Sequence, residues 1–311
     1  MVSCIVDATF DGMRVYDVLR VQLGASDGSV RRAKHVPEGL LLDGRPTWTK
    51  ARVQTGQEVS LVIDAPGMAG SSTDLVPEQG EVQVAFADDD VLVVEKPAGL
   101  VMYPSPGHSN GTLANRVVGW LRDQGRQCGL HAVHRLDRDT SGLVVFALNS
   151  YAKDRVQGQL HTDAFAREYR AVCVGWPATD AGTIDAPLGK LSTSPNVFGV
   201  LPDGKPSLTH YQVLCRGNGS QGQPRALVGV RLETGRTHQI RIHLAHIGHP
   251  LVGDATYGSA SADIDRAALH SAHLAFIHPV TGKHLQFGSP VPPDMRALLV
   301  GGQFVGNAPI W

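Results

Sequence analysis

Cysteine is scarce in this chain of 311 residues: the four cysteines are at positions 4, 128, 173 and 215. Because no two form a C-x-x-C pair, neither a zinc knuckle nor a disulfide framework is indicated, and incidental or buried thiols are expected. Long apolar runs are also missing. The longest extends from Leu143 to Leu148, whereas a membrane-spanning helix needs about 20 apolar residues, so no membrane partner is expected.

A recognisable secretory signal is missing as well. The first residues after Met1 do not show a basic segment followed by an apolar one, so a cytoplasmic location is expected. The sequence also lacks a Rossmann glycine fingerprint and a Walker loop, which are the common signatures of dinucleotide and nucleoside triphosphate sites. No internal repeat is evident.

The chain has almost no net charge, with a formal value of -1 at pH 7, but its charges are unevenly distributed. Residues 64–90 contain seven acidic residues and no lysine or arginine, which leaves the rest of the chain positive. Residues 31–52 contain six basic and two acidic residues. A basic run of this size is more often a solvated surface than a binding site, although it suits contacts with nucleic-acid phosphates.

The composition, 42% hydrophobic and 18% charged, is typical of an ordered protein with one large domain or two unequal ones. Residues 1–63 are expected to form a small α+β unit, with an apolar helix side and two extended segments. Residues 64–80 are rich in acidic, proline, glycine and serine residues, so we expect a linker there. A second domain is then expected over residues 81–311.

Short apolar runs in the second region predict buried strands, notably over 91–94 and 143–148. Thr112 and Asn149 are suitable caps for two helices that follow them. Because strands and helices do not alternate regularly, the predicted fold class is α+β with a central mixed sheet.

A polar segment from His134 to Gly142 directly precedes one predicted strand. Asp137, in a short loop at the end of a sheet, is well placed for nucleophilic or acid–base chemistry. The same residues also suit a simple turn. A further alternative is a phosphatase with paired aspartates, since Asp139 lies two residues later; however, His134 and Arg135 interrupt the apolar strand that such an enzyme needs.

A second polar segment runs from Leu232 to Asp254. Thr237 is expected to cap a helix that ends at Gly248. This places Arg236 in the turn before the helix and Arg241 in its first turns, where guanidinium groups can hold a carboxylate or phosphate. The histidines at 243 and 246 suggest a metal site only weakly, because no cysteine or glutamate completes a ligand set. No metal is therefore expected.

Four blocks of the sequence resemble motifs of the RluA family of pseudouridine synthases, and they agree with that family in order and spacing. The block from His134 to Gly142 resembles the family's catalytic signature, and the block around Lys96 and Pro97 resembles its lysine–proline motif. Residues 165–175 resemble the block that bears an active-site tyrosine, and residues 234–254 resemble the third motif. Met102 and Tyr103 replace the usual Val-His of the first loop, and Arg167 replaces a usual lysine, without changing the general class of side chain.

The resemblance implies a pseudouridine synthase fold with a largely antiparallel central sheet. It implies that Asp137 is the catalytic carboxylate, that Arg241 is the cation beside it, and that Tyr169 stacks on the uracil. Arg135 is expected to fill the space left by an extruded base or to hold phosphates, with a surface salt bridge as the alternative. Lys96 and Arg236 are further candidates for RNA binding, through contacts with phosphate, or for structural contacts. The implied reaction is an isomerisation, so no cofactor is expected.

Residues 1–63 resemble, less closely, an S4 domain, a small RNA-binding module of many such synthases. Its expected RNA contacts are Arg31, Arg32 and Lys34. The resemblance favours large-subunit (23S) ribosomal RNA as the substrate, with transfer RNA as the alternative. A non-catalytic RNA-binding or ribosome-assembly protein is the alternative of another class, and the protein is expected to be a monomer.

Overall fold

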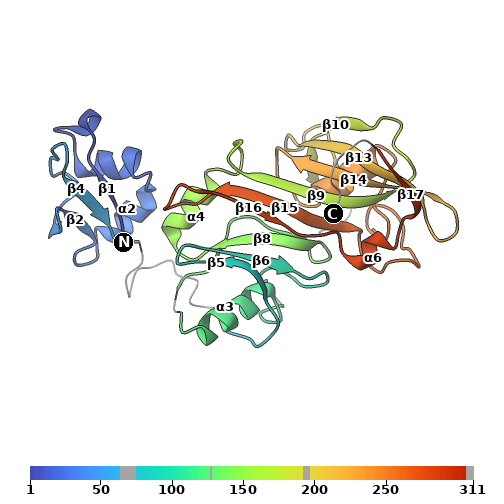
Figure 1. Ribbon diagram of the computed structural model, residues 1–311, viewed down its shortest axis with the longest axis horizontal. Coiled ribbons are helices and arrows are strands. Elements are labelled where there is room, and N and C mark those ends of the chain that lie inside the picture. Colours follow the sequence, from blue (N-terminus) through green and yellow to red (C-terminus); the bar gives the residue numbers. More distant parts are fainter. Residues whose placement is uncertain (64–74, 127, 192–196, 306–311) are drawn as a thin grey trace.

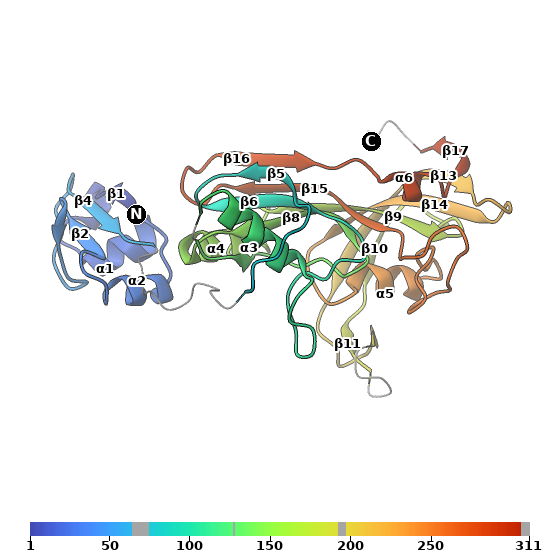
Figure 2. The same cartoon turned by 90° about the horizontal axis from the view of Figure 1, so that it is seen from below.

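The computed structural model describes residues 1–63, 75–126, 128–191 and 197–305. A small N-terminal unit stands beside one end of a long sheet, next to helix α4 (Figure 1). The same arrangement is visible from below, where β11 projects away from the large sheet (Figure 2). Among the described residues, no helix is long and apolar enough to cross a membrane.

The N-terminal unit contains a four-stranded antiparallel sheet in the order β1-β4-β2-β3. The strands are β1 (Val2–Ile5), β2 (Leu40–Leu42), β3 (Arg45–Pro46) and β4 (Glu58–Leu61). Asp43 and Gly44, both with positive φ, form the turn between β2 and β3 that an Asp-Gly pair favours. The helical segments are η1 (Ala8–Phe10), α1 (Val15–Asp17), η2 (Val18–Gln22) and α2 (Asp27–Ala33).

This unit has its own hydrophobic core. Val15, Val18 and Leu19 are fully buried, as their helical spacing predicts, and they pack with Val59 and Leu61 of β4. The burial of one apolar helix side against one sheet face is what stabilises so small a unit.

The second region is built on an 11-stranded sheet whose main path is β10-β13-β14-β9-β15-β8-β6-β5. Its strands are β5 (Gln83–Ala87), β6 (Val91–Lys96), β7 (His131–Ala132), β8 (Ser141–Ala147), β9 (Ala166–Val174), β10 (Ala181–Asp185), β13 (Leu208–Asn218), β14 (Pro224–Leu232), β15 (Leu269–Ile277), β16 (His284–Gly288) and β17 (Val300–Phe304). Only the pair β15–β8 is parallel among the described strand pairs. The prediction of an α+β fold with a mixed, largely antiparallel sheet is confirmed.

Helix α3 (Leu113–Asp123) and helix α4 (Ser150–Gln157) begin where the sequence predicts. The Thr112 side chain accepts from the Asn115 amide, and the Asn149 side chain accepts from the Ala152 amide. Each cap satisfies a donor that the first helical turn leaves unpaired. The remaining elements are the hairpin β11 (Leu188–Lys190) and β12 (Phe198–Val200), helix α5 (Gln239–His246) and helix α6 (Pro293–Arg296).

Helix α5 starts differently from the prediction. Its N-cap is His238, not Thr237, and the His238 backbone is left-handed, with φ of 56°. The His238 side chain does not cap the helix. Gln239 supplies the polar contacts at this end instead: its side-chain oxygen, Oε1, accepts from the Arg236 backbone amide at 3.0 Å. The predicted end is confirmed, since Gly248 has φ of +85° directly after the helix.

The predicted linker over 64–80 lies outside the described residues up to position 74. From Leu75 the chain runs along α3: the Asn115 side chain donates to the Val76 carbonyl at 2.8 Å, and the Glu78 amide donates to the Asn115 carbonyl at 3.1 Å. A Cβ on Gly119 would lie 2.1 Å from the Glu78 carbonyl oxygen. Glycine at this position therefore allows the segment to cross the helix closely.

The N-terminal unit contacts helix α4 directly. The Tyr151 side chain is buried in the core of the unit, and its hydroxyl donates to the Leu23 carbonyl at 2.9 Å. Asp154, one turn later on α4, accepts from the hydroxyls of Ser26 and Ser29 at the start of α2. These contacts place the basic helix α2 next to the part of α4 that lines the cavities described below.

Candidate active site

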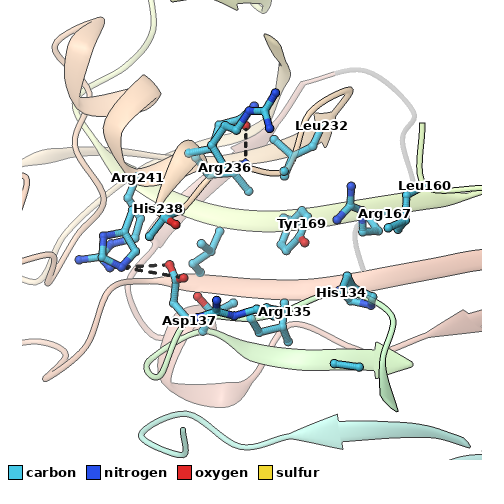
Figure 3. A pocket seen from close by; sticks show the side chains of 18 of the residues that line it. His134, Arg135, Asp137, Leu160, Arg167, Tyr169, Leu232, Arg236, His238 and Arg241 are labelled. Atoms are coloured by element: carbon cyan, nitrogen blue, oxygen red, sulfur yellow. Dashed lines mark hydrogen bonds and ion pairs between the residues drawn. The ribbon is translucent and has the colours of Figure 1, made fainter. Parts of the chain in front are cut away.

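A cavity of about 390 Å³ opens beside the large sheet. Its walls come from the connection between β7 and β8, from the end of α4 and the residues after it, from β9, and from the turn before α5 with the first turns of that helix. Asp137, His238 and Arg241 point toward one another at one end of this cavity, and Tyr169 and Arg167 lie further along it (Figure 3).

Asp137 lies in a tight turn just before β8. The Thr140 amide donates to the Asp137 carbonyl at 3.2 Å, and β8 follows between β6 and β15. Gly142, with φ of +107°, is required at the start of β8, because a Cβ there would lie 2.2 Å from the Ser271 carbonyl oxygen of β15. The Asp137 side chain is 29% exposed, so its carboxylate is open to the cavity.

Arg241 and Asp137 come together as the sequence predicts. One Arg241 guanidinium nitrogen lies 3.7 Å from Oδ2 of Asp137. The guanidinium makes two shorter contacts with Asp254, both of 2.7 Å, through Nε and Nη2. Arg241 is thus a bidentate partner of Asp254 that also faces Asp137.

Asp254 is completely buried and fully satisfied. Besides Arg241, its Oδ1 accepts from the backbone amides of Thr256 and Tyr257. Burial raises the pKa of Asp254, but the Arg241 contacts and the two amides outweigh burial and hold it below the usual value. Burial lowers the pKa of Arg241, but the contacts with Asp254 raise it by more, so the net shift of the Arg241 pKa is upward. Both groups are therefore charged at neutral pH.

Tyr169 is held rigidly in the middle of β9, between β14 and β15. Only 4% of the residue is exposed, and its side chain lines the cavity. Burial raises the pKa of Tyr169, against a smaller opposing effect of Arg167. The phenol is thus protonated at neutral pH, and its ring forms a flat wall of the cavity.

Arg135 and Arg236 also line the cavity, and both are exposed. Arg236 donates to the Pro206 carbonyl at 3.4 Å through two nitrogens. Arg135 borders a second cavity of about 780 Å³ that shares Asp137 and His238 with the first. This second cavity carries further positive charge from Arg138 and Lys153.

Of the two roles expected for Lys96, a contact with RNA phosphate or a structural contact, the structure shows the structural one. It is 1% exposed, and its ammonium donates to the carbonyls of Pro97, Leu100 and Arg138 at 2.7–2.8 Å. All three of its donors are used inside the protein, so a contact with RNA phosphate is excluded by this geometry. Lys96 instead ties β6 to the turn that carries Asp137.

We expect Lys96→Met to lower the free energy of unfolding by about 2 kcal/mol or more, because the carbonyls of Pro97, Leu100 and Arg138 lose the donor that they share. Urea unfolding measures this loss. Lys153→Met is the matched control, since Lys153 is partly exposed on α4, and we expect a change within about 0.5 kcal/mol. Equal stability of the Lys96 variant and the wild type would contradict a structural role.

Two histidines near the cavity were not singled out from the sequence. His134 is buried, and burial lowers its pKa to about 3; its ring packs edge-on against Phe165, so it acts as a neutral core residue. His238 lies with Nε2 3.9 Å from Oδ1 of Asp137. Its position between Arg236 and Arg241 in one block was the available signal.

The alternative interpretations from sequence are not supported by the contacts. Asp139 is bound by the neighbouring Arg138 at 2.9 and 3.1 Å, so the two aspartates do not form a converging phosphatase pair. Both ring nitrogens of His243 are used, by the Thr209 hydroxyl and the Ala186 carbonyl, which excludes His243 as a metal ligand in this arrangement.

The described residues contain one other group with ligand-like spacing, formed by Asp88, Asp90 and His278. His278 is already bonded through both ring nitrogens, to the Asp88 carboxylate at 2.7 Å and to the amides of Val280 and Thr281. None of the three acidic or histidine residues lines the two cavities around Asp137. The group is therefore a hydrogen-bonded corner of the sheet and not part of this site.

Comparison with known proteins agrees with this geometry. A family model described as RNA pseudouridylate synthase matches residues 90–246, the range that contains Asp137, Tyr169 and Arg241. An uncharacterized RNA pseudouridine synthase of Bacillus subtilis is 38% identical over 264 residues, which cover 84% of this chain and 84% of the relative. A ribosomal large subunit pseudouridine synthase D of Pseudomonas aeruginosa is 35% identical, and the match covers 91% and 90%.

A solved structure gives the same result for the fold. The human protein named RNA pseudouridylate synthase domain containing 1 superposes with a TM-score of 0.59 at 26% identity. The superposition covers 74% of this chain and 94% of the human chain.

Proposed function

This chain belongs to the RNA pseudouridylate synthase family and is an isomerase that acts on uridine in RNA; we propose that its substrate is large-subunit (23S) ribosomal RNA. The choice of RNA is supported by relatives named ribosomal large subunit pseudouridine synthase D, which match at 35% identity over most of the chain. The observation that carries the chemistry is the open carboxylate of Asp137 in a cavity, with a guanidinium 3.7 Å from it.

The reaction rearranges uridine without net change in atoms or electrons. The bond from N1 of uracil to C1′ of ribose breaks, a bond from C5 to C1′ forms, and the proton lost from C5 is balanced by one gained at N1. We assign Asp137 as the catalytic carboxylate. It can add to C1′, add to C6 of the base, or assist loss of the base through a glycal, and the roles below hold for each route.

Arg241 faces the Asp137 carboxylate with the opposite charge and helps to orient it. Arg241 stays in this position because Asp254 holds its guanidinium from the other side. Arg241 is therefore preorganised before RNA arrives, which avoids a reorganisation cost during the reaction.

Tyr169 is assigned to the uracil ring. A buried ring fixed by two neighbouring strands offers a flat apolar surface for stacking. Because burial raises the pKa of Tyr169, its hydroxyl is protonated when the base arrives. Tyr169 can therefore accept the C5 proton only after its own hydroxyl proton has been transferred to another group.

The target base must leave its stack to reach Asp137, at a cost of a few kcal/mol. Arg135 is exposed beside both cavities, which suits it to fill the vacated position or to hold the adjacent phosphates. Arg236 borders the first cavity and is the further candidate for a phosphate contact.

The N-terminal unit is proposed to be an S4-like RNA-binding domain over residues 1–63, with the catalytic domain from residue 81. Arg31 and Lys34 are exposed on and after α2. Arg32 and Lys153 both act on His131, whose pKa is lowered first by burial and then by these two cations. The cations of α2 thus adjoin those of the second cavity, and we propose that one RNA contacts both, on a monomeric enzyme in the cytoplasm.

Pseudouridine mapping tests the choice of RNA. Ribosomal and transfer RNA from a strain without this protein are treated with carbodiimide, and the stops of reverse transcription are compared with those of the parent strain. We expect one or more stops to disappear from 23S RNA and to return with the wild-type gene but not with an Asp137→Asn gene. Loss of stops only in transfer RNA would overturn the proposed substrate, and no loss in any RNA would favour a non-catalytic role.

A further inference from the structure

His238 and Arg241 approach different oxygens of the Asp137 carboxylate. Its Nε2 lies 3.9 Å from Oδ1, whereas Arg241 Nη1 lies 3.7 Å from Oδ2 (Figure 3). We propose that His238 is a positioning residue that orients the Asp137 carboxylate through its Nε2–H group, and that Tyr257 holds His238 in the tautomer required. This inference rests on the proposed catalytic role of Asp137.

The contacts of Tyr257 favour one position for the imidazole proton. The Tyr257 hydroxyl oxygen accepts from the Phe198 backbone amide at 3.3 Å, so its own proton is free to be donated. That hydroxyl lies 2.8 Å from Nδ1 of His238. When Nδ1 accepts from Tyr257, the single proton of neutral imidazole is on Nε2, the nitrogen that faces Asp137.

The imidazole of His238 is neutral at neutral pH, because its pKa is lowered from the usual value. Burial lowers the pKa of His238, and Arg241 and Arg135 lower it further, while Asp137 and Asp254 oppose the shift. Burial raises the pKa of Tyr257, so its hydroxyl keeps the proton that it donates. A neutral imidazole orients the carboxylate without forming a tight ion pair that would quench its reactivity.

Capping of helix α5 does not explain the orientation of the His238 side chain. An N-cap residue normally accepts a hydrogen bond from the first turn, but His238 makes no such bond, and Gln239 provides the polar contacts instead. The left-handed backbone of His238, with φ of 56°, is uncommon for a residue other than glycine. Such a conformation persists where surrounding contacts require it, and here it directs the ring into the cavity.

Tyr257 supports both neighbours of Asp137. Its ring lies under the Arg241 guanidinium, with 5.0 Å from Cζ to the ring centroid, and it packs edge-on against His238. Its backbone amide donates to Asp254. The His238–Asp137 distance is longer than a hydrogen bond, and active-site contacts of this kind commonly shorten when substrate binds.

Steady-state kinetics of His238 variants test the proposal. The substrate is total RNA extracted from a strain that lacks this protein, so the assay does not depend on which RNA is modified. We expect His238→Leu to lower kcat by about 10–100-fold, since small misplacement of a reacting group has effects of this size, with KM within about 3-fold. His238→Gln retains an N–H donor near the position of Nε2 and should restore kcat to within about 5-fold of wild type.

Two further variants separate positioning from general structural damage. Tyr257→Phe keeps the ring beneath Arg241 and removes only the hydroxyl, so we expect a drop of kcat of about 3–10-fold without a change in thermal midpoint. His246→Leu is the matched control, because His246 is exposed at the other end of α5, and its kcat should be unchanged.

The outcomes distinguish this proposal from the proposed function. If the wild type turns over RNA and His238→Leu keeps its kcat, or raises only KM, the positioning role is wrong while the proposed function stands. If Leu and Gln at position 238 lower kcat equally, an N–H donor is not what matters and the proposal is again overturned. If the wild type itself forms no pseudouridine in any RNA, the proposed function fails first.

Discussion

Asp137→Asn abolishes pseudouridine formation and leaves RNA binding intact: this is the largest effect that we expect. The amide has nearly the shape of the carboxylate, but it carries no charge and is neither a nucleophile nor a base. We expect kcat to fall on the order of 10³-fold or more. Pseudouridine formation in total RNA from the deletion strain measures turnover, and filter binding of the same RNA measures affinity.

The isosteric change makes this result specific. Among the residues that the structure describes, the nearest charged partners of the Asp137 side chain, Arg241 and His238, lie 3.7 and 3.9 Å away, beyond hydrogen-bond distance. We therefore expect the thermal midpoint to be unchanged by loss of the Asp137 charge. Asp139→Asn is the control, since Asp139 is bound to Arg138 and lines neither of the two cavities around Asp137. Turnover of Asp137→Asn within 10-fold of wild type would remove the catalytic assignment.

The second large effect is expected at Asp254, which affects both stability and activity. Asp254→Ala leaves the guanidinium of Arg241 buried without its bidentate partner. Breaking a buried ion pair from one side costs about 3–5 kcal/mol, which urea unfolding detects. The freed Arg241 also becomes able to close on Asp137, so kcat should fall in the fraction that remains folded.

The Asp254 interaction also predicts how the free energy of unfolding changes at acidic pH. The folded-state pKa of Asp254 is lower than its usual value, so its contribution to stability is present above about pH 4. That contribution is lost as the pH falls through the folded-state pKa. The wild type therefore loses stability in this acidic range, and Asp254→Ala should show a smaller decline.

An exposed ion pair serves as the control for Asp254. Asp89 is fully exposed beside Arg126, and Asp89→Ala should change the free energy of unfolding by less than about 1 kcal/mol. If Asp254→Ala and Asp89→Ala had similar stabilities, Asp254 would not be the anchor of Arg241.

The local signals in the sequence were sufficient for many of the elements. The apolar runs at 91–94 and 143–148 are buried strands, and the caps Thr112 and Asn149 begin helices, because strand burial and helix capping depend on residues close in sequence. The start of α5 was placed one residue early. A threonine is the better cap by local preference, but the Gln239 contacts to the Leu208 carbonyl and the Thr209 hydroxyl outweigh that preference.

The candidate site was predictable only in part. The sequence indicated that Asp137, Tyr169 and Arg241 meet, and the structure brings all three to one cavity. Lys96 was expected to make either phosphate or structural contacts, and the structure shows the structural ones: its amino group is enclosed by three carbonyls, one of them from Arg138, far away in sequence. His238 was missed because its partner Tyr257 and its neighbour Asp137 belong to other segments.

The sequence by itself determined the chemistry that this protein can perform, because the identities of a carboxylate, a guanidinium and a phenol are properties of single residues. Only the tertiary structure decided which of those groups are available. In the folded chain Asp254 anchors Arg241, buried Lys96 connects two segments through its hydrogen bonds, and His238 faces Asp137. Such choices depend on distances between segments that are far apart along the chain, and no local pattern of residues contains them.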